Sequence, residues 1–285
     1  MIDEVNEHTL KQKQHSKRRF GRIGQILWAL GLSLWVGVVI IGMQLLLGLV
    51  IAFLNLKGYL EKAGVMAFVQ ALVYVLSFLV LTTSIKKIEK RRGGLRAKQS
   101  RTAKPAVVSK KADGWSLFGL EGLPTWSDIL LAPIGLVVTM IVSGVVMAVA
   151  MKLMPNLSWD QQQQLGFGDL YDPVSRTMAF LALVIIAPLA EEIIFRGWLY
   201  GKLRTRVGAA LSIILVSLVF AALHMQMNVA LVVGVMSVTM CLLREMTGTI
   251  WAGILVHMLK NGIAFYVLFV NPVLAPMAVL ITLVL

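Results

Sequence analysis

The sequence predicts an all-α protein, a polytopic transmembrane helical bundle of about eight spans. Hydrophobic residues make up 58% of the 285-residue chain and charged residues only 14%, with a mean hydropathy of +0.81. A soluble globule needs more polar surface than this composition provides. The apolar residues also gather in runs that approach or exceed the roughly 20 residues that a helix needs to cross a bilayer. These runs are 24–56, 64–85, 129–151, 177–200, 208–225, 228–243, 249–270 and 273–285.

The first and last runs depart from the usual length. Run 24–56 is overlong, so its helix is expected to tilt or to protrude from the bilayer. It is also much longer than the roughly 7 to 15 apolar residues of a signal peptide, so we expect it to remain as an anchor. Run 273–285 has 13 residues and is interpreted as half a span or a truncated span.

The basic residues predict an integral protein of the plasma membrane with a cytoplasmic amino terminus. Of the 27 Lys and Arg residues, 21 fall in segments that would then face the cytoplasm, and four would face the outside. This asymmetry is typical of membrane proteins, whose cytoplasmic loops are rich in Lys and Arg. The net charge of +13 therefore indicates contact with anionic lipid headgroups and argues against a nucleic-acid partner. The cytoplasmic segments are Lys11–Arg22, Lys86–Lys111, Lys202–Arg206 and Arg244, and the outer residues are Lys57, Lys62, Lys152 and Arg176.

A long basic segment divides the chain into parts. Residues 1–22 form a basic cytoplasmic tail, residues 23–85 two anchoring transmembrane helices, and residues 86–128 a basic cytoplasmic linker. The tail and the Lys, Ala and Ser-rich part of the linker are expected to be loosely ordered. Residues 129–285 form the transmembrane core, which is expected to hold every ionisable residue at membrane depth. Cys241, the only cysteine, excludes an intramolecular disulfide and is interpreted as a packing residue.

Two adjacent carboxylates, Glu191 and Glu192, interrupt the apolar stretch 178–200. Every other acidic residue is assigned to a tail, loop or linker. A carboxylate at membrane depth costs about 2 to 3 kcal/mol or more unless it is paired, protonated or hydrated, so this pair is a functional candidate. Arg196 follows Glu192 by four residues and is its neighbour on a helix, whereas Glu191 lies about 100° around the axis and faces something else. The alternative interpretation is a salt-bridged helix end near the cytoplasm.

Two histidines and an asparagine lie on later runs. Phe220 precedes His224 by one helical turn, and Asn261 follows His257 by one turn. A single intramembrane histidine is often a packing hydrogen-bonder. Here, however, two histidines occur together with an asparagine and a carboxylate pair on three neighbouring runs. This combination favours a common site.

Two features of these runs need an explanation. Lys260 lies next to Asn261 at apparent membrane depth, so it is expected either to pair with a carboxylate or to line a wet cavity. Counting about 1.5 Å per residue puts Glu191 and His257 about 13 Å from the cytoplasmic end of their helices and His224 about 25 Å deep. The helices around residues 202–206 are therefore expected to protrude into the cytoplasm.

These residue types can hydrolyse an amide. A desolvated carboxylate can act as a general base on water, and an imidazole nearby can position that water or pass the proton. A second imidazole and an asparagine amide, one turn apart, can donate hydrogen bonds to a developing oxyanion. Alternatively, Glu191, His224 and His257 could hold zinc with one position left for water. The chain has no HExxH motif of the common zinc proteases.

The motifs resemble those of one family. Glu191, Glu192 and Arg196 match an EExxxR motif, Phe220 and His224 an FxxxH motif, and His257 and Asn261 an HxxxN motif. In this order and rough spacing they resemble the CPBP (Abi) intramembrane proteases, which include the type II CAAX prenyl endopeptidase and bacterial homologues linked to bacteriocin self-immunity. The resemblance covers residues 115–270 and implies an eight-helix fold and endopeptidase activity. It implies that Glu191 activates water, that His224 assists, and that His257 and Asn261 hold the oxyanion.

The sequence is therefore interpreted as a prokaryotic homologue of this family, a membrane endopeptidase of glutamate type or metallo type. Its expected partners are membrane lipid and a peptide or membrane-protein substrate, and its possible cofactor is Zn²⁺. The main alternative is a non-catalytic membrane scaffold or bacteriocin immunity protein of the same fold. A third class is a proton-coupled or ion-coupled transporter, but the inverted repeats and paired broken helices typical of transporters are not evident in the sequence.

Overall fold

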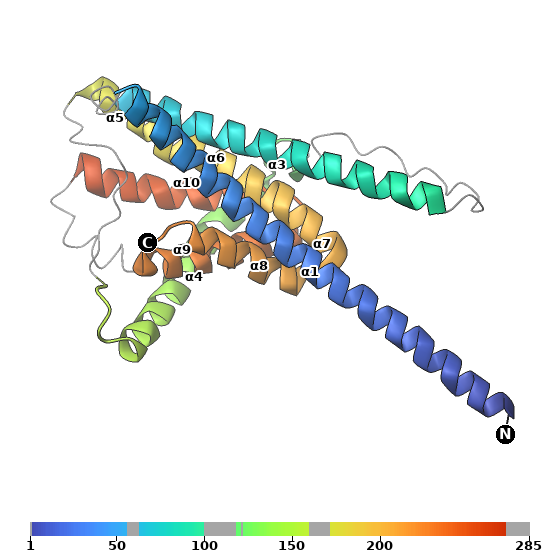
Figure 1. Ribbon diagram of the computed structural model, residues 1–285. Coiled ribbons are helices and arrows are strands. Elements are labelled where there is room, and N and C mark those ends of the chain that lie inside the picture. Colours follow the sequence, from blue (N-terminus) through green and yellow to red (C-terminus); the bar gives the residue numbers. More distant parts are fainter. Residues whose placement is uncertain (1, 56–62, 100–117, 121, 160–171, 272–285) are drawn as a thin grey trace.

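The computed structural model describes residues 2–55, 63–99, 118–120, 122–159 and 172–271, which form a helical bundle that contains no strand (Figure 1). The predicted all-α class is confirmed. Six of the helices are long and apolar enough to cross a membrane, so the chain is an integral membrane protein. In chain order the helices are α1 (Ile2–Phe53), α3 (Ala63–Gln99), α4 (Trp126–Leu153), α5 (Pro173–Phe180), η2 (Leu181–Ile186), α6 (Ala187–Glu192), η3 (Ile193–Tyr200), α7 (Gly201–Val207), α8 (Ala209–Ala222), α9 (Met227–Thr247), α10 (Trp251–Phe265) and η4 (Tyr266–Val270).

Seven of the eight predicted apolar runs fall on these helices, and the eighth, 273–285, lies outside the described residues. Run 208–225 differs from a full span. Its helix, α8, has 14 residues, which is about 21 Å at 1.5 Å per residue, whereas the hydrocarbon core is about 30 Å thick. Helix α8 is therefore too short to cross the bilayer by itself, and the turn after it contains His224.

The two anchoring helices extend further than expected. The tail 1–22 is helical from Ile2 as the start of α1, and α3 continues to Gln99, so the first part of the 86–128 linker is helical as well. The residues that extend these helices are rich in Lys, Arg, Gln and Glu, which are good helix formers. Lengthening an existing helix also avoids the cost of nucleating a new one. Both extensions project away from the bundle (Figure 1).

A continuous helical segment, 173–207, runs through the bundle and consists of α5, η2, α6, η3 and α7. The Asp172 side chain caps its first turn by accepting a hydrogen bond from the Ser175 N–H (2.8 Å), and Pro173 is at the first helical position. The segment ends at Gly208, whose φ of +82° requires glycine. Its 35 residues correspond to roughly 50 Å, which exceeds the thickness of the bilayer core and allows the protrusion expected around residues 202–206.

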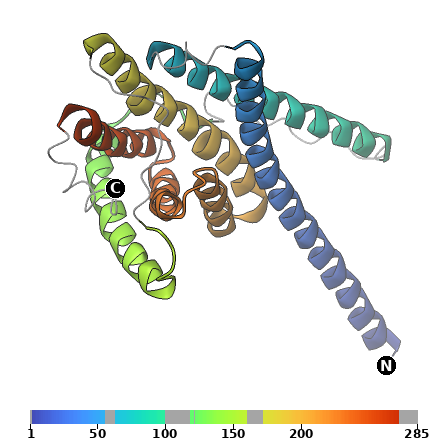
Figure 2. The same ribbon diagram turned by 60° about the vertical axis from the view of Figure 1, so that its left-hand side comes forward.

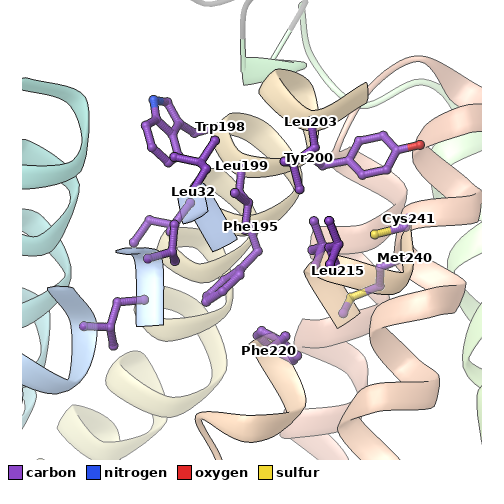
Figure 3. Packing of buried hydrophobic residues seen from close by; sticks show 14 of the residues in the cluster. Leu32, Phe195, Trp198, Leu199, Tyr200, Leu203, Leu215, Phe220, Met240 and Cys241 are labelled. Atoms are coloured by element: carbon purple, nitrogen blue, oxygen red, sulfur yellow. The ribbon is translucent and has the colours of Figure 1, made fainter. Parts of the chain in front are cut away.

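Segment 173–207, which we call the central segment, is buried on all sides from Ile194 to Tyr200. On one side it contacts α1 and α3, and on another α8, α9 and α10. Figure 2 shows α1 and α3 (blue to blue-green) and α4 (light green) on opposite sides of the bundle. Cys241 is fully buried in the apolar cluster around this segment, as predicted for a packing residue (Figure 3). The stretch from Ile194 to Tyr200 is therefore enclosed by protein.

Helix α4 packs against α9 and α10, with Gly135 at the contact. A Cβ at Gly135 would lie 3.0 to 3.1 Å from methyl groups of Leu243 and Val256, so a larger residue would require these side chains to shift. The α4 amino terminus is joined to the α9–α10 turn because Thr249 donates a hydrogen bond to Asp128 (3.0 Å).

Two acidic residues correct one expectation. Asp128 lies in the first turn of α4 and Glu245 in the last turn of α9, so they are helical rather than in loops. Both are at helix ends, and both accept hydrogen bonds. Asp128 accepts one from Thr125, and Glu245 accepts one from Tyr200 (2.7 Å) and one from Arg204 (2.9 Å). The Glu191 and Glu192 pair, by contrast, lies in the middle of the continuous helical segment 173–207.

Candidate active site

The carboxylate pair lies on α6, a short α-helical stretch between the π-helical stretches η2 and η3. In a π-helix each N–H bonds to the carbonyl five residues earlier, and such stretches are frequent at functional sites. The Ala187 N–H follows this register and bonds to the Ala182 carbonyl. The next donor would be Pro188, which has no N–H, so the Leu183 carbonyl loses that partner.

Asn261 of α10 takes the place of the missing donor. Its Nδ2 donates a hydrogen bond to the Leu183 carbonyl (2.9 Å). This contact joins α10 to the central segment near the carboxylates. Because an amide nitrogen carries two hydrogens, the contact leaves one of them for another acceptor.

Glu192 is fully buried and is paired as the sequence predicts. Its Oε1 accepts a hydrogen bond from Arg196 Nη1 (2.7 Å), and neither side chain is appreciably exposed. The Arg196 guanidinium also lies over the Phe220 ring, 4.4 Å from its centroid. His257 Nδ1 lies 3.3 Å from the same Glu192 Oε1. The expected Glu192–Arg196 contact is therefore confirmed, and it includes a third member, His257.

Gly253 makes room for Glu192. It lies one turn before His257 on α10, and a Cβ at this position would be 3.1 Å from Glu192 Oε2 and 3.4 Å from Met240 Cβ. Because Glu192 is held by Arg196 and His257, it could not move aside without weakening those contacts. A single face of α10 thus presents Gly253, His257 and Asn261 to the central segment.

Glu191 has a different environment. Its side chain keeps 15% of its surface exposed, whereas that of Glu192 has none. Its Oε2 lies 3.7 Å from His257 Nε2. Its Oε1 accepts a hydrogen bond from the Tyr74 hydroxyl of α3. Glu191 is therefore the more exposed carboxylate of the pair.

His257 lies between the two carboxylates. Nδ1 faces Glu192, and Nε2 faces Glu191. An ionised carboxylate only accepts hydrogen bonds, so the Glu192 contact places a hydrogen on Nδ1 and fixes the orientation of the ring. The ring is buried, with 5% of its side chain exposed.

His224 lies in the turn after α8, beside the same aromatic ring. Its Nδ1 is 2.9 Å from the Phe220 carbonyl, and its ring centroid is 5.0 Å from that of Phe220. Phe220 also contacts the His257 ring, with centroids 6.0 Å apart. Because Nδ1 of His224 faces the carbonyl, its Nε2 is the nitrogen available for chemistry.

Lys260 is partly buried, three residues after His257. Among the described residues it forms no ion pair within 4 Å, and the charge that acts on it is that of Glu191. Lys260 was expected either to pair with a carboxylate or to line a wet cavity. The direct pair with a carboxylate is not formed.

The expected zinc ligands are Glu191, His224 and His257. Among the described residues, no group of three His, Cys, Asp or Glu side chains lies close enough to hold one. Glu191 and His257 approach each other, but His224 does not complete the expected set. These three side chains therefore do not form a three-ligand zinc site in this structure.

Two contributors to the site were missed by the sequence analysis, Tyr74 and Gly253. Tyr74 contradicts the expectation that only the core carries ionisable residues at membrane depth. The pattern that could have indicated it is Gln70 and Tyr74, two polar side chains one turn apart in the first half of the apolar run 64–85. Gly253 could have been found from its position four residues before His257, on the same face as Asn261.

A comparison with protein families finds a match over the segment that holds these residues. Residues 173–263, about a third of the chain, match the family described as type II CAAX prenyl endopeptidase Rce1-like. The matching segment contains the central segment 173–207, α8, α9 and most of α10, and with them all three motifs. The resemblance drawn from the motifs is thus confirmed over this segment. No curated protein and no solved structure matches the chain.

Proposed function

We propose that this chain, with its CAAX-protease-like segment, is an intramembrane endopeptidase that hydrolyses membrane-associated protein or peptide substrates with water activated by Glu191. The observation that carries the proposal is the position of His257 between Glu191 and the buried Glu192–Arg196 pair. Buried charge of this kind is costly in a membrane protein and usually marks a functional site. The family match over residues 173–263 supports the same activity.

In the proposed reaction, Glu191 Oε2 removes a proton from a water molecule as its oxygen attacks the carbonyl carbon of the substrate. His224 Nε2 holds that water. The proton on Glu191 then passes to the leaving amide nitrogen as the C–N bond breaks, which restores the carboxylate and completes the hydrolysis. Glu192 and Arg196 take no proton. They hold the His257 ring in place.

The oxyanion of the tetrahedral intermediate would be held by α10. His257 would donate from Nε2, and Asn261 would donate the hydrogen that the Leu183 carbonyl does not use. Their spacing of one turn places both donors on one helix face. Donors held in advance inside a shielded site stabilise the developing charge more than water does.

Asn261→Ala is expected to lower kcat by about 100- to 1,000-fold with little change in KM, because one oxyanion donor is lost and the contact forms mainly in the transition state. It also leaves the Leu183 carbonyl without a donor, which costs about 1 to 3 kcal/mol of stability. The kinetic constants are measured by peptide cleavage with purified protein, and the stability is measured as a thermal unfolding midpoint.

Thr249→Ala is the control for this prediction. It removes another hydrogen bond between helices, the 3.0 Å contact with Asp128, which involves neither Glu191 nor Glu192. It should lower stability and leave kcat unchanged. If Asn261→Ala behaved in the same way, Asn261 would be a structural residue only.

The metallo-type alternative, with Glu191, His224 and His257 as ligands of Zn²⁺, is tested in the same preparations. Metal content is measured by mass spectrometry in the wild type, His224→Ala and His257→Ala. The metal-free mechanism predicts that the rate falls in both variants without a change in metal content. Stoichiometric zinc in the wild type that disappears in His257→Ala would overturn it.

In the proposed topology the protein lies in the plasma membrane with a cytoplasmic amino terminus. The support is the division of the basic residues, 21 on the cytoplasmic side and four on the outside. A reporter inserted within 86–111 should behave as cytoplasmic, and one near Gln162 as external. Protease protection of tagged protein in sealed vesicles provides an independent measurement. A linker found on the outside would reverse the arrangement and place the central segment in the opposite orientation.

A further inference from the structure

Tyr74 brings the second anchoring helix to the carboxylate pair. It lies on α3, outside the segment 173–263 that matches the family, and α3 packs against α5, η2 and α6. The Tyr74 hydroxyl donates to Glu191 Oε1. The contact spans 117 positions of sequence, so only the fold brings the two residues together.

The two oxygens of Glu191 face different groups. Oε1 is held by Tyr74, and Oε2 lies 3.7 Å from His257 Nε2. A carboxylate that bonds through one oxygen can no longer rotate freely about its terminal bond, so the direction of the second oxygen is fixed as well. Glu192 is oriented in the same way by Arg196 (2.7 Å). Each carboxylate of the pair therefore has a donor of its own.

We propose that Tyr74 is a positioning residue for Glu191, which fixes the carboxylate so that Oε2 is the oxygen that accepts the proton from water. This inference rests on the proposed endopeptidase function. It assigns α3 to the active site, in addition to its role as an anchor. The tyrosine hydroxyl suits this task because it donates one hydrogen bond from a rigid ring and stays neutral at ordinary pH. Because α3 comes from another part of the chain, its packing on α6 determines whether Glu191 is competent.

The test compares two tyrosines that each donate to a carboxylate. Tyr74→Phe removes only the hydroxyl that faces Glu191, and Tyr200→Phe removes the hydroxyl that donates to Glu245 (2.7 Å), away from the pair. Tyr74→Phe is expected to lower kcat by about 10- to 100-fold, because the base is no longer held in the productive orientation. Its KM should stay within about twofold, since substrate binding is unchanged. Tyr200→Phe should keep the wild-type kcat.

A double-mutant cycle checks that the effect passes through Glu191. Thermal unfolding midpoints are measured at one scan rate in detergent for wild type, Tyr74→Phe, Glu191→Ala and the double variant. Coupling is expected: Tyr74→Phe should shift the midpoint in the presence of Glu191 and have a smaller effect in Glu191→Ala. The cycle needs no catalysis and also reports whether each variant is folded.

The outcomes separate this inference from the proposed function. If the wild type cleaves its substrate and Tyr74→Phe keeps the same kcat, the positioning role is wrong while the endopeptidase function stands. A loss of kcat in Tyr74→Phe without coupling in the cycle also overturns the role, because the effect would not act through Glu191. If the purified wild type cleaves no peptide, the endopeptidase function itself is overturned, and the positioning role falls with it.

Discussion

Glu191→Gln is expected to reduce peptide cleavage by about 100- to 10,000-fold, the usual contribution of a general base. The amide has nearly the same shape as the carboxylate and can still accept the hydrogen bond from Tyr74, but it cannot take a proton from water. The variant should remain folded and inserted. Its stability should equal or exceed that of the wild type, because a neutral amide costs less than a carboxylate at membrane depth.

The measurement begins in cells, because the substrate must first be identified. Membranes that contain the wild type or Glu191→Gln are compared by proteomics of newly formed protein termini. Peptides around the termini that depend on Glu191 are then assayed with purified protein. A non-catalytic scaffold predicts the same termini in both membranes, and wild-type cleavage by folded Glu191→Gln would remove Glu191 from its assigned role.

Much of the helical architecture could be predicted because its cause is local. Apolar runs of about 20 residues must form helices in lipid, where each backbone polar group needs a partner within its own segment. The Glu192–Arg196 contact could be predicted for the same reason, since residues four apart on a helix are neighbours. Hydropathy does not report where a polar helix ends, so the extensions of α1 and α3 were missed.

The rest of the site depends on packing between distant segments. Nothing in the sequence around Tyr74 indicates that α3 lies against α6. The link from Pro188 through the freed Leu183 carbonyl to Asn261 requires a π-helical register that only the folded backbone shows. Gly253 is informative only once Glu192 is known to lie 3.1 Å from the Cβ position. In each case the pattern is present in the sequence, but its partner belongs to another helix.

The buried ion pair explains why the two carboxylates should respond differently to mutation. Glu191 has some exposed surface and a neutral donor, Tyr74, so it tolerates the loss of its charge. Glu192 has no exposed surface and faces a guanidinium and an imidazole. Removing one partner of such a pair leaves the other charge buried without compensation, which is more costly than the pair itself.

Arg196→Leu is therefore expected to destabilise the protein by roughly 3 to 5 kcal/mol, and Glu192→Gln should also lower stability because it leaves the Arg196 charge buried. Arg196→Leu also loses the contact of the guanidinium with the Phe220 ring, 4.4 Å from the centroid. The measurement is unfolding of purified protein in detergent, followed by temperature or denaturant. Adding Glu192→Gln to Arg196→Leu should recover part of the loss, because the charge left behind is then removed as well.

Arg204→Leu is the matched control for this prediction. It breaks the ion pair with Glu245 (2.9 Å), but the two side chains are 47% and 31% exposed. Water replaces the lost partner there, so the expected cost is much smaller than that of Arg196→Leu. Equal losses from Arg196→Leu and Arg204→Leu would show that burial does not set the cost of the pair. Equal losses of activity in fully folded Glu191→Gln, Glu192→Gln and Arg196→Leu would show that the two carboxylates do not have separate tasks.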